Sequence, residues 1–183
     1  MLNDQLFEWD ELNLIRQQAK ILWATPPTRE QRERFCDWLE FVLCHVYEFG
    51  WEGVEDILGP IHVEWNGDLD TVNMEIAGKT FRDRIMDENT ADEIIRVIDT
   101  EAHRDYNTGV YNAAKASGIT GLKKQWHTRM DNRVRDPHAY LEGVSVGLDD
   151  RFYTYSGESA LYPGGFGVPE LDVNCRCSIT IVR

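Results

Sequence analysis

Two cysteines one residue apart, together with one histidine, are the residues of this sequence best suited to hold a metal ion. Cys175 and Cys177 directly precede Ser178–Val182, whose β-branched residues predict a strand. Because alternate residues of an extended chain point to the same side, both sulfurs would face one way. Two thiolates and an imidazole suit a soft metal such as zinc. The candidate metal ligands are therefore His138, Cys175 and Cys177, with His127, Asp131 or Asp136 as a fourth.

The spacing of these cysteines leaves two other interpretations open. Cys-x-Cys is not an established zinc pattern, so the pair could also be reduced and packed at the start of a strand, or joined as a disulfide. Cys36 and Cys44 are eight residues apart in a predicted helix, which separates them by about 12 Å. Since a disulfide needs Cα atoms within about 7 Å, we expect these two to be small buried side chains.

Two other groups of residues resemble catalytic patterns without the context that catalysis needs. Gly143–Gly147 matches the G-x-S-x-G nucleophile motif, but no histidine follows His138, and the surroundings predict a hairpin rather than a strand–turn–helix. Glu101, His103 and Asp105 fall on a predicted helix, where Glu101 and Asp105 share a face that we expect to pack or to meet solvent.

Charge is distributed unevenly along the 183 residues. The formal net charge is −13; residues 1–100 hold 22 acidic against nine basic side chains, whereas residues 101–183 hold ten of each. Residues 115–135 are locally basic and include a tryptophan, a combination that can follow a phosphate backbone. The alternative is that this segment pairs with the acidic first half. The candidate DNA contacts are Lys115, Lys123, Lys124, Trp126, Arg129, Arg133 and Arg135.

The acidic first part of the chain, residues 1–70, reads as a helical hairpin. Apolar residues recur at steps of three and four over residues 3–24 and again over 28–49. Pro26 and Pro27 separate the two helices, and Gly50 would end the second. A short strand is expected over residues 61–65.

The remainder of the chain predicts helices followed by strands. We expect helices over 71–87 and 90–117, mixed helical or irregular segments over 119–136, and a β-rich lobe over 138–183. In that lobe, residues 144–146 and 151–155 would form a hairpin, and 178–182 a closing strand. The fold class is therefore α+β, with an N-terminal helical hairpin and long helices followed by a small antiparallel lobe. No run approaches 18 apolar residues, so no membrane association is expected.

Several motifs occur in a fixed order across the second half. They are Thr100-Glu101-Ala102-His103-Arg104 with Asn107, then Lys124-Gln125-Trp126, Arg135-Asp136-Pro137-His138 with Leu141-Glu142-Gly143, Asp149-Asp150-Arg151-Phe152, Pro163-Gly164 and Asn174-Cys175-Arg176-Cys177. This order closely resembles the phage Mu F-like family of minor head proteins, also called the phage head morphogenesis domain. The resemblance covers residues 75–180, so residues 71–183 are expected to form that domain.

The resemblance implies a non-enzymatic minor capsid protein of a tailed phage or prophage. Such a protein would be made in the host cytoplasm, reside inside the virion head, and associate with the portal and with major capsid or scaffold proteins, and with packaged double-stranded DNA. The resemblance also raises the expectation of a structural zinc ion at His138, Cys175 and Cys177. The alternative is a small metal-dependent hydrolase or nuclease at the same residues, with Glu101 or Asp136 as base. The motif residues expected to form a buried polar frame are Glu101, Arg104, Asn107, Arg135 and Asp136.

Overall fold

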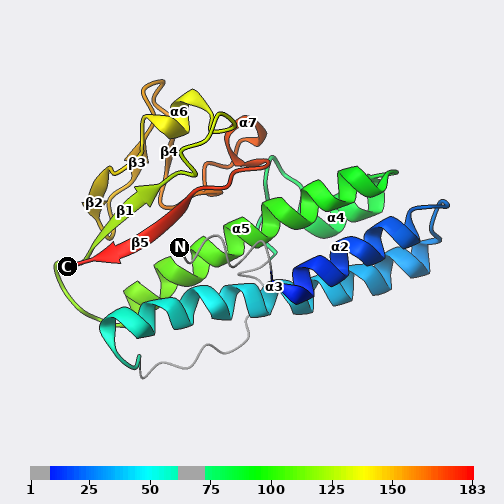
Figure 1. Ribbon diagram of the computed structural model, residues 1–183, viewed down its shortest axis with the longest axis horizontal. Helices are drawn as coiled ribbons and strands as arrows, with labels where there is room; N and C mark the ends of the chain where they lie inside the picture. The colour runs from blue at the N-terminus through cyan, green and yellow to red at the C-terminus, as the bar shows by residue number, and fades with distance from the viewer. Residues whose placement is uncertain (1–8, 62–72) are drawn as a thin grey trace.

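The computed structural model describes residues 9–61 and 73–183, and places a small β lobe against a layer of long helices (Figure 1). The helical part consists of α2 (Asp10–Leu22), α3 (Arg29–Leu58), α4 (Phe81–Asp87) and α5 (Ala91–Ala116). The lobe contains β1 (Lys123–His127), α6 (Asp136–Ala139), β2 (Ser145–Gly147), β3 (Phe152–Tyr153), β4 (Ser159–Ala160), α7 (Pro169–Asp172) and β5 (Ser178–Val182). The α+β prediction is confirmed.

Helices α3 and α5 begin where the sequence predicts, because a threonine caps each of them. Thr28 and Thr90 each accept a hydrogen bond from the backbone N–H three residues on, and the Gln31 or Glu93 side chain there accepts one in return. The predicted end of α3 at Gly50 is wrong, since the helix continues to Leu58. Gly50 instead lies where α3 crosses α5, and a Cβ built on it would be 2.2 Å from the Tyr106 carbonyl oxygen.

The helix expected over 71–87 is much shorter. Within the described part of that segment, Ile76 and Lys79 close a tight turn, with Ala77 at φ 50° and Gly78 at φ 73°, so only Phe81–Asp87 is helical. Thr80 and Asp83 form the capping box that starts α4. Residues 3–8 of the first predicted helix and residues 62–65 of the short predicted strand lie outside the described residues.

The strands pair differently from the prediction. The three-stranded sheet has the order β2-β1-β5, and all its pairs are antiparallel. Its central strand β1 lies in the segment expected to be helical or irregular. The predicted hairpin between residues 144–146 and 151–155 is wrong, since β2 pairs with β1 while β3 pairs with β4. The β1 and β2 partners are distant in sequence, so local turn residues do not specify their pairing, whereas β3 and β4 form a hairpin through residues 154–158.

Helix α5 is the centre of the molecule. One side packs on α3, and another lies along β5 in the lobe (Figure 1). A continuous core therefore joins residues from the acidic helical hairpin to residues from the lobe, among them Leu39, Val46, Ile98, Val110, Trp126 and Ile179. None of the helices in the described ranges is long and apolar enough to cross a membrane.

Candidate metal centre

His138, Cys175 and Cys177 meet inside the lobe. His138 is carried by α6, whereas both cysteines precede β5 and follow Asn174, whose φ of 56° turns the chain. The His138 Nδ1 atom lies 3.6 Å from Cys175 Sγ and 3.5 Å from Cys177 Sγ. All three side chains are at most 3% exposed, and their ligand atoms lie within 4.8 Å of one another. The residues singled out from the sequence are therefore brought together.

These distances fit a tetrahedral zinc ion. Zn–S bonds of about 2.3 Å and Zn–N bonds of about 2.05 Å, at a tetrahedral angle, put sulfur and nitrogen about 3.6 Å apart. The donor set of one imidazole and two cysteine sulfurs is also one that zinc prefers. The group could therefore hold a metal ion with little movement of its side chains.

The two thiols differ in their tendency to ionise. The pKa of Cys177 is lowered, first by a hydrogen bond from Cys175 and also by the adjacent Trp126 side chain. The pKa of Cys175 is raised well above its usual value by the same hydrogen bond and by burial. Because a metal ion binds cysteine as the thiolate, a bound cation would release the protons of these thiols.

Aromatic rings enclose the three ligands. The Trp126 ring is fully buried and meets the His138 ring edge-on, with centroids 5.8 Å apart. On another side Phe166 stacks on His138 at 5.7 Å and an angle of 16°. Asp172 accepts hydrogen bonds from the backbone N–H groups of Phe166 and Gly167 and so fixes the loop that carries this ring. The imidazole is therefore held in place before any metal binds.

None of the expected fourth ligands joins this group. His127 is hydrogen-bonded to the Thr180 hydroxyl at 2.8 Å. Asp131 forms two hydrogen bonds with Arg176, at 2.8 and 2.7 Å. Among the described residues, only His138, Cys175 and Cys177 form a group of His, Cys, Asp or Glu side chains whose ligand atoms lie within 4.8 Å of one another.

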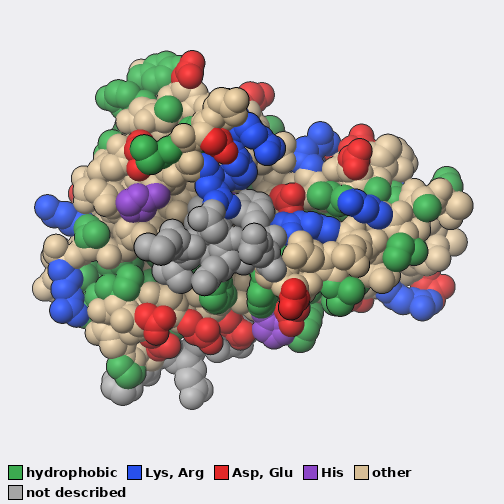
Figure 2. Space-filling model, viewed as in Figure 1, with side chains coloured by type: hydrophobic (Ala, Val, Ile, Leu, Met, Phe, Trp, Pro, Cys, Tyr) green, Lys and Arg blue, Asp and Glu red, His purple; other side chains and the backbone are tan. Residues whose placement is uncertain are grey.

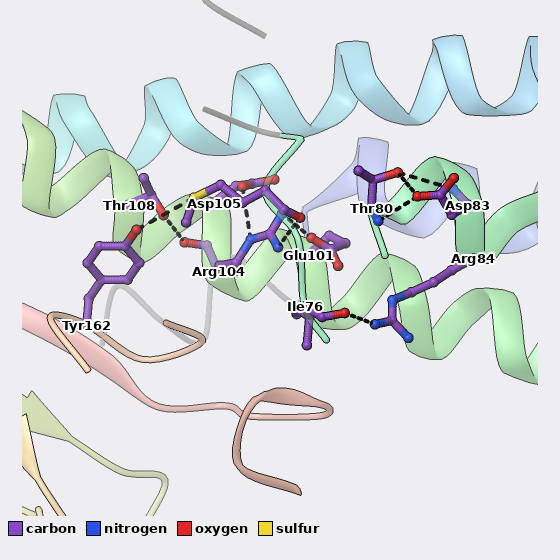
Figure 3. Close-up of polar contacts among 10 residues, drawn as sticks. Ile76, Thr80, Asp83, Arg84, Glu101, Arg104, Asp105, Thr108 and Tyr162 are labelled. Carbon is purple, nitrogen blue, oxygen red and sulfur yellow. Dashed lines mark hydrogen bonds and ion pairs between the residues drawn. The ribbon is translucent and has the colours of Figure 1, made fainter. Parts of the chain in front are cut away.

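Three residues of the expected polar frame, Glu101, Arg104 and Asn107, are buried on α5. Glu101 and Arg104 form an ion pair, and Arg104 also donates to the Met74 carbonyl (Figure 3). Burial raises the pKa of the Glu101 carboxyl, while the charge of Arg104 opposes this. Asn107 donates to the Cys177 carbonyl at 3.1 Å and accepts from the Ile179 N–H at 2.9 Å. It therefore attaches α5 to the segment that carries the two cysteines, Cys175–Cys177, which is called the metal-ligand segment below.

The other two frame residues lie nearer the surface. The Arg135 guanidinium donates to the Val173 carbonyl and thereby joins the segment before α6 to the one after α7. Asp136 begins α6 and is exposed.

The seven candidate DNA contacts do not share one surface. Lys124 and Trp126 are fully buried on β1. The Lys124 ammonium lies over the Tyr111 ring at 4.9 Å, and burial lowers its pKa to about 8. Lys115 pairs with Asp149 far along the chain, and Lys123 is exposed on β1. The three candidate arginines, Arg129, Arg133 and Arg135, border the small cavity beside the metal ligands.

Sequence reasoning missed the parts of the site that depend on tertiary contact. No sequence pattern indicates that Phe166 would stack on His138. The role of Trp126 could have been found, because Lys124 and Trp126 alternate with more exposed residues as one face of a buried strand does. Recognising β1 as a strand would have placed that indole on the core side of the sheet.

Comparison with known proteins agrees with this architecture. Residues 72–180 match the family described as phage Mu protein F like protein. The chain belongs to that family, and the matched region contains the metal-ligand group, α5 and almost the whole lobe.

Two curated relatives resemble part of the chain. The NAD(+)–arginine ADP-ribosyltransferase EFV of Enterococcus faecalis (strain ATCC 700802 / V583) is 39% identical over 89 residues, which are 47% of this chain and 18% of that protein. The minor head protein GP7 of Bacillus phage SPP1 is 31% identical over 84 residues, 45% of this chain and 27% of that protein. The similarity thus spans less than a third of either relative's length. No solved structure matches.

Proposed function

We propose that this chain is a minor head protein of a tailed phage or prophage and acts by binding rather than by catalysis. The observation that carries the proposal is the match of residues 72–180 to the phage Mu protein F like family, supported by the similarity to a phage minor head protein. In this proposal the protein is made in the host cytoplasm, joins the portal and the capsid or scaffold proteins during head assembly, and remains inside the virion head.

The surroundings of the metal-ligand group favour a structural role over a catalytic one. The cavity beside the ligands has a volume of only about 10 Å³, and in the described residues no carboxylate lines it. Glu101, the expected base, is paired with Arg104 and borders a different cleft. A hydrolytic zinc site needs an open coordination position and a base within reach. Among the described residues, the small cavity supplies little room and no carboxylate, and in the larger pocket that reaches Cys175 the Asp99 carboxylate is bonded to Arg16.

We further propose that the bound metal is a structural zinc ion held by His138, Cys175 and Cys177. A metal there would join α6 to the segment before β5, two parts of the lobe that are distant in sequence. It would stabilise the lobe rather than activate water. Metal analysis of protein purified without chelators is the direct test: we expect one zinc per chain, and a chain without metal would refute this assignment.

The head role is tested with the phage or prophage that encodes the protein. We expect a tagged copy to co-purify with the portal protein, virions to contain it, and its deletion to impair the formation of normal heads. Restoration by the unaltered gene is the control. Virions that lack the protein, together with normal procapsids formed in its absence, would contradict the proposal.

A metal-dependent hydrolase is the second candidate, because the ligand group would suit either role. Zinc-loaded protein is incubated with supercoiled and linear DNA, and with NAD⁺ because of the name of one partial relative. We expect neither cleavage nor consumption above that of the Cys177→Ser variant. Metal-dependent turnover that this variant abolishes would replace the structural assignment with a catalytic one.

A further inference from the structure

The metal-ligand segment places two thiols on the same side of one short stretch of chain. The Cys175 and Cys177 sulfur atoms lie within 4.8 Å of each other, and both face the His138 imidazole. The Arg176 side chain between them bonds Asp131 instead, as alternation along an extended chain requires. Two thiols so close together can react with each other as well as bind a metal.

The distance between the two cysteines suits a disulfide. Cα atoms two residues apart in an extended chain are separated by about 6.6 Å, and disulfides join Cα atoms up to about 6.8 Å apart. Hydrogen bonds hold the backbone at both cysteines: the Cys175 N–H donates to the Asp172 carbonyl at 3.0 Å, and the Cys177 carbonyl accepts from Asn107 at 3.1 Å. Closing the bond therefore needs mainly a rotation of the two side chains.

One of the two sulfurs can be reached by small solutes. Cys175 lines a pocket of about 330 Å³ between α5 and the lobe, and other described lining residues, among them Asp99 and Arg133, are polar. Figure 2 shows Lys and Arg side chains grouped where the lobe meets the helices. The cavity that Cys177 borders has a volume of about 10 Å³, which is room for about one water molecule at most. A small polar oxidant would therefore reach Cys175 first.

We propose that Cys175 and Cys177 form a redox pair, which hydrogen peroxide converts to a disulfide with release of the bound metal. The Cys175 thiolate attacks a peroxide oxygen, so that the O–O bond breaks, a sulfenic acid forms on Cys175 and hydroxide leaves. The Cys177 thiolate then attacks the Cys175 sulfur, the S–S bond forms, and a second hydroxide leaves. The two sulfurs together give up two electrons, and the peroxide accepts them.

Oxidation of the pair would change how the lobe is held together. Metal ions bind cysteine as the thiolate, so a disulfide leaves the metal without two of its ligands. The link from His138 on α6 to the metal-ligand segment is then lost, while weaker contacts such as the Arg135 bond to the Val173 carbonyl remain. Asn107 still holds the Cys177 carbonyl. Oxidation should therefore loosen α6 and leave β5 in place on α5.

The time at which the disulfide forms rests on the proposed head function. Thiols stay reduced in the host cytoplasm, so the metal-bound form is the one that takes part in assembly. A virion outside the cell has left that reducing environment, and there the disulfide would accumulate. The chemistry of the pair is a property of the isolated chain and does not depend on this role.

The test uses the purified full chain, loaded with zinc and treated with hydrogen peroxide. Released zinc is measured with a colorimetric chelator, free thiols are alkylated, and the peptides are identified by mass spectrometry. We expect one zinc to be released for each Cys175–Cys177 disulfide, while Cys36 and Cys44 remain thiols. Dithiothreitol with added zinc should restore the starting state.

Two variants and a second measurement separate this chemistry from a purely structural site. Cys44→Ser is the matched control, because this half-buried thiol lies on α3, and the variant should behave like the original protein. In Cys177→Ser, Cys175 should proceed to a sulfinic acid, because no second thiol remains to trap the sulfenic acid. Hydrogen exchange of the oxidised protein should be faster at the amides of α6 and unchanged at those of β5.

Four results would overturn the inference: peroxide leaves both cysteines as thiols, oxidises Cys175 to a sulfinic acid without a disulfide, links either cysteine to another chain, or leaves the exchange of α6 unchanged after the disulfide has formed. A disulfide that forms in a chain without zinc would support the pair and overturn only the metal assignment. Since these assays contain no phage component, their failure leaves the proposed head function untouched, and a failure of head assembly leaves the redox pair untouched.

Discussion

The crossing of α3 and α5 offers a sharp test of the packing. Gly50 and Gly109 face each other's helices there: a Cβ on Gly109 would be 2.1 Å from the Tyr47 carbonyl oxygen, and one on Gly50 would be 2.2 Å from that of Tyr106. Ordinary contacts begin at 3.4 Å. A methyl group therefore forces the two backbones apart by roughly 1 Å, since neither carbonyl is a flexible side-chain end.

The expected change in the free energy of unfolding of Gly109→Ala is the difference between two opposing effects. Alanine in place of glycine favours a helix interior by about 0.8–1 kcal/mol. Overpacking at a rigid contact costs about 1–3 kcal/mol or more, and here it spreads through the longest helix–helix interface of the core. We expect Gly109→Ala to lower the free energy of unfolding by about 2 kcal/mol, and Tm by about 4–8 °C for a chain of this size.

Gly53→Ala on α3 is the matched control, because nothing lies within 4 Å of its Cβ. It should gain the helix preference without the clash and stabilise the protein by about 0.5–1 kcal/mol. Urea unfolding followed by circular dichroism measures both variants. A Gly109→Ala variant as stable as the original protein, or a Gly53→Ala variant equally destabilised, would refute the described crossing.

Three further predictions concern the site and its support. Chelation of the metal should lower Tm by several degrees. Cys177→Ser should abolish stoichiometric zinc binding, whereas Cys36→Ser should retain it. Equal metal content in the two variants would contradict the ligand assignment. Asn107→Ala should cost about 2–4 kcal/mol in urea unfolding, because it leaves a buried N–H and a buried carbonyl unpaired, and a loss below 1 kcal/mol would show that they find other partners. The pKa of His103 is depressed to about 4, so the unfolded chain binds the extra proton first, and stability falls as pH decreases from about 6.5 to 4. This fall in the free energy of unfolding amounts to at most about 3 kcal/mol. Urea titrations over this pH range should show a smaller fall in His103→Gln. An equal fall in the two proteins would exclude His103 as its cause.

The elements best predicted from the sequence are those whose signals are local. Thr28 and Thr90 fix helix starts through side chains three residues away, and the β-branched run at the end of the chain forms β5 as expected. The His138, Cys175 and Cys177 group was also foreseeable, because alternation along an extended chain and the family's motif order both point to it.

The elements that could not be predicted depend on partners distant in sequence. Gly50 resembles a helix terminator, yet it is required inside α3 because Tyr106 of α5 approaches it. The pairing of β2 with β1, which are distant in sequence, replaces the hairpin expected at Asp149, and Trp126 of β1 packs edge-on against Phe152 of β3 in one core. The pocket of about 330 Å³ beside Cys175 likewise combines α5 with two loops that are distant in sequence, and residues of only one of these loops belong to the basic stretch seen in the sequence.

The Asn107 side chain has a consequence for how this protein can meet its neighbours. β5 is an edge strand of the sheet, and edge strands present free N–H and carbonyl groups on which another chain can add a strand. Asn107 offers the same donor and acceptor as a neighbouring strand would, and it occupies the Cys177 carbonyl and the Ile179 N–H. With α5 lying along that edge, the sheet is closed to strand addition there. In the proposed head role, this would prevent neighbouring chains from adding a strand at the β5 edge.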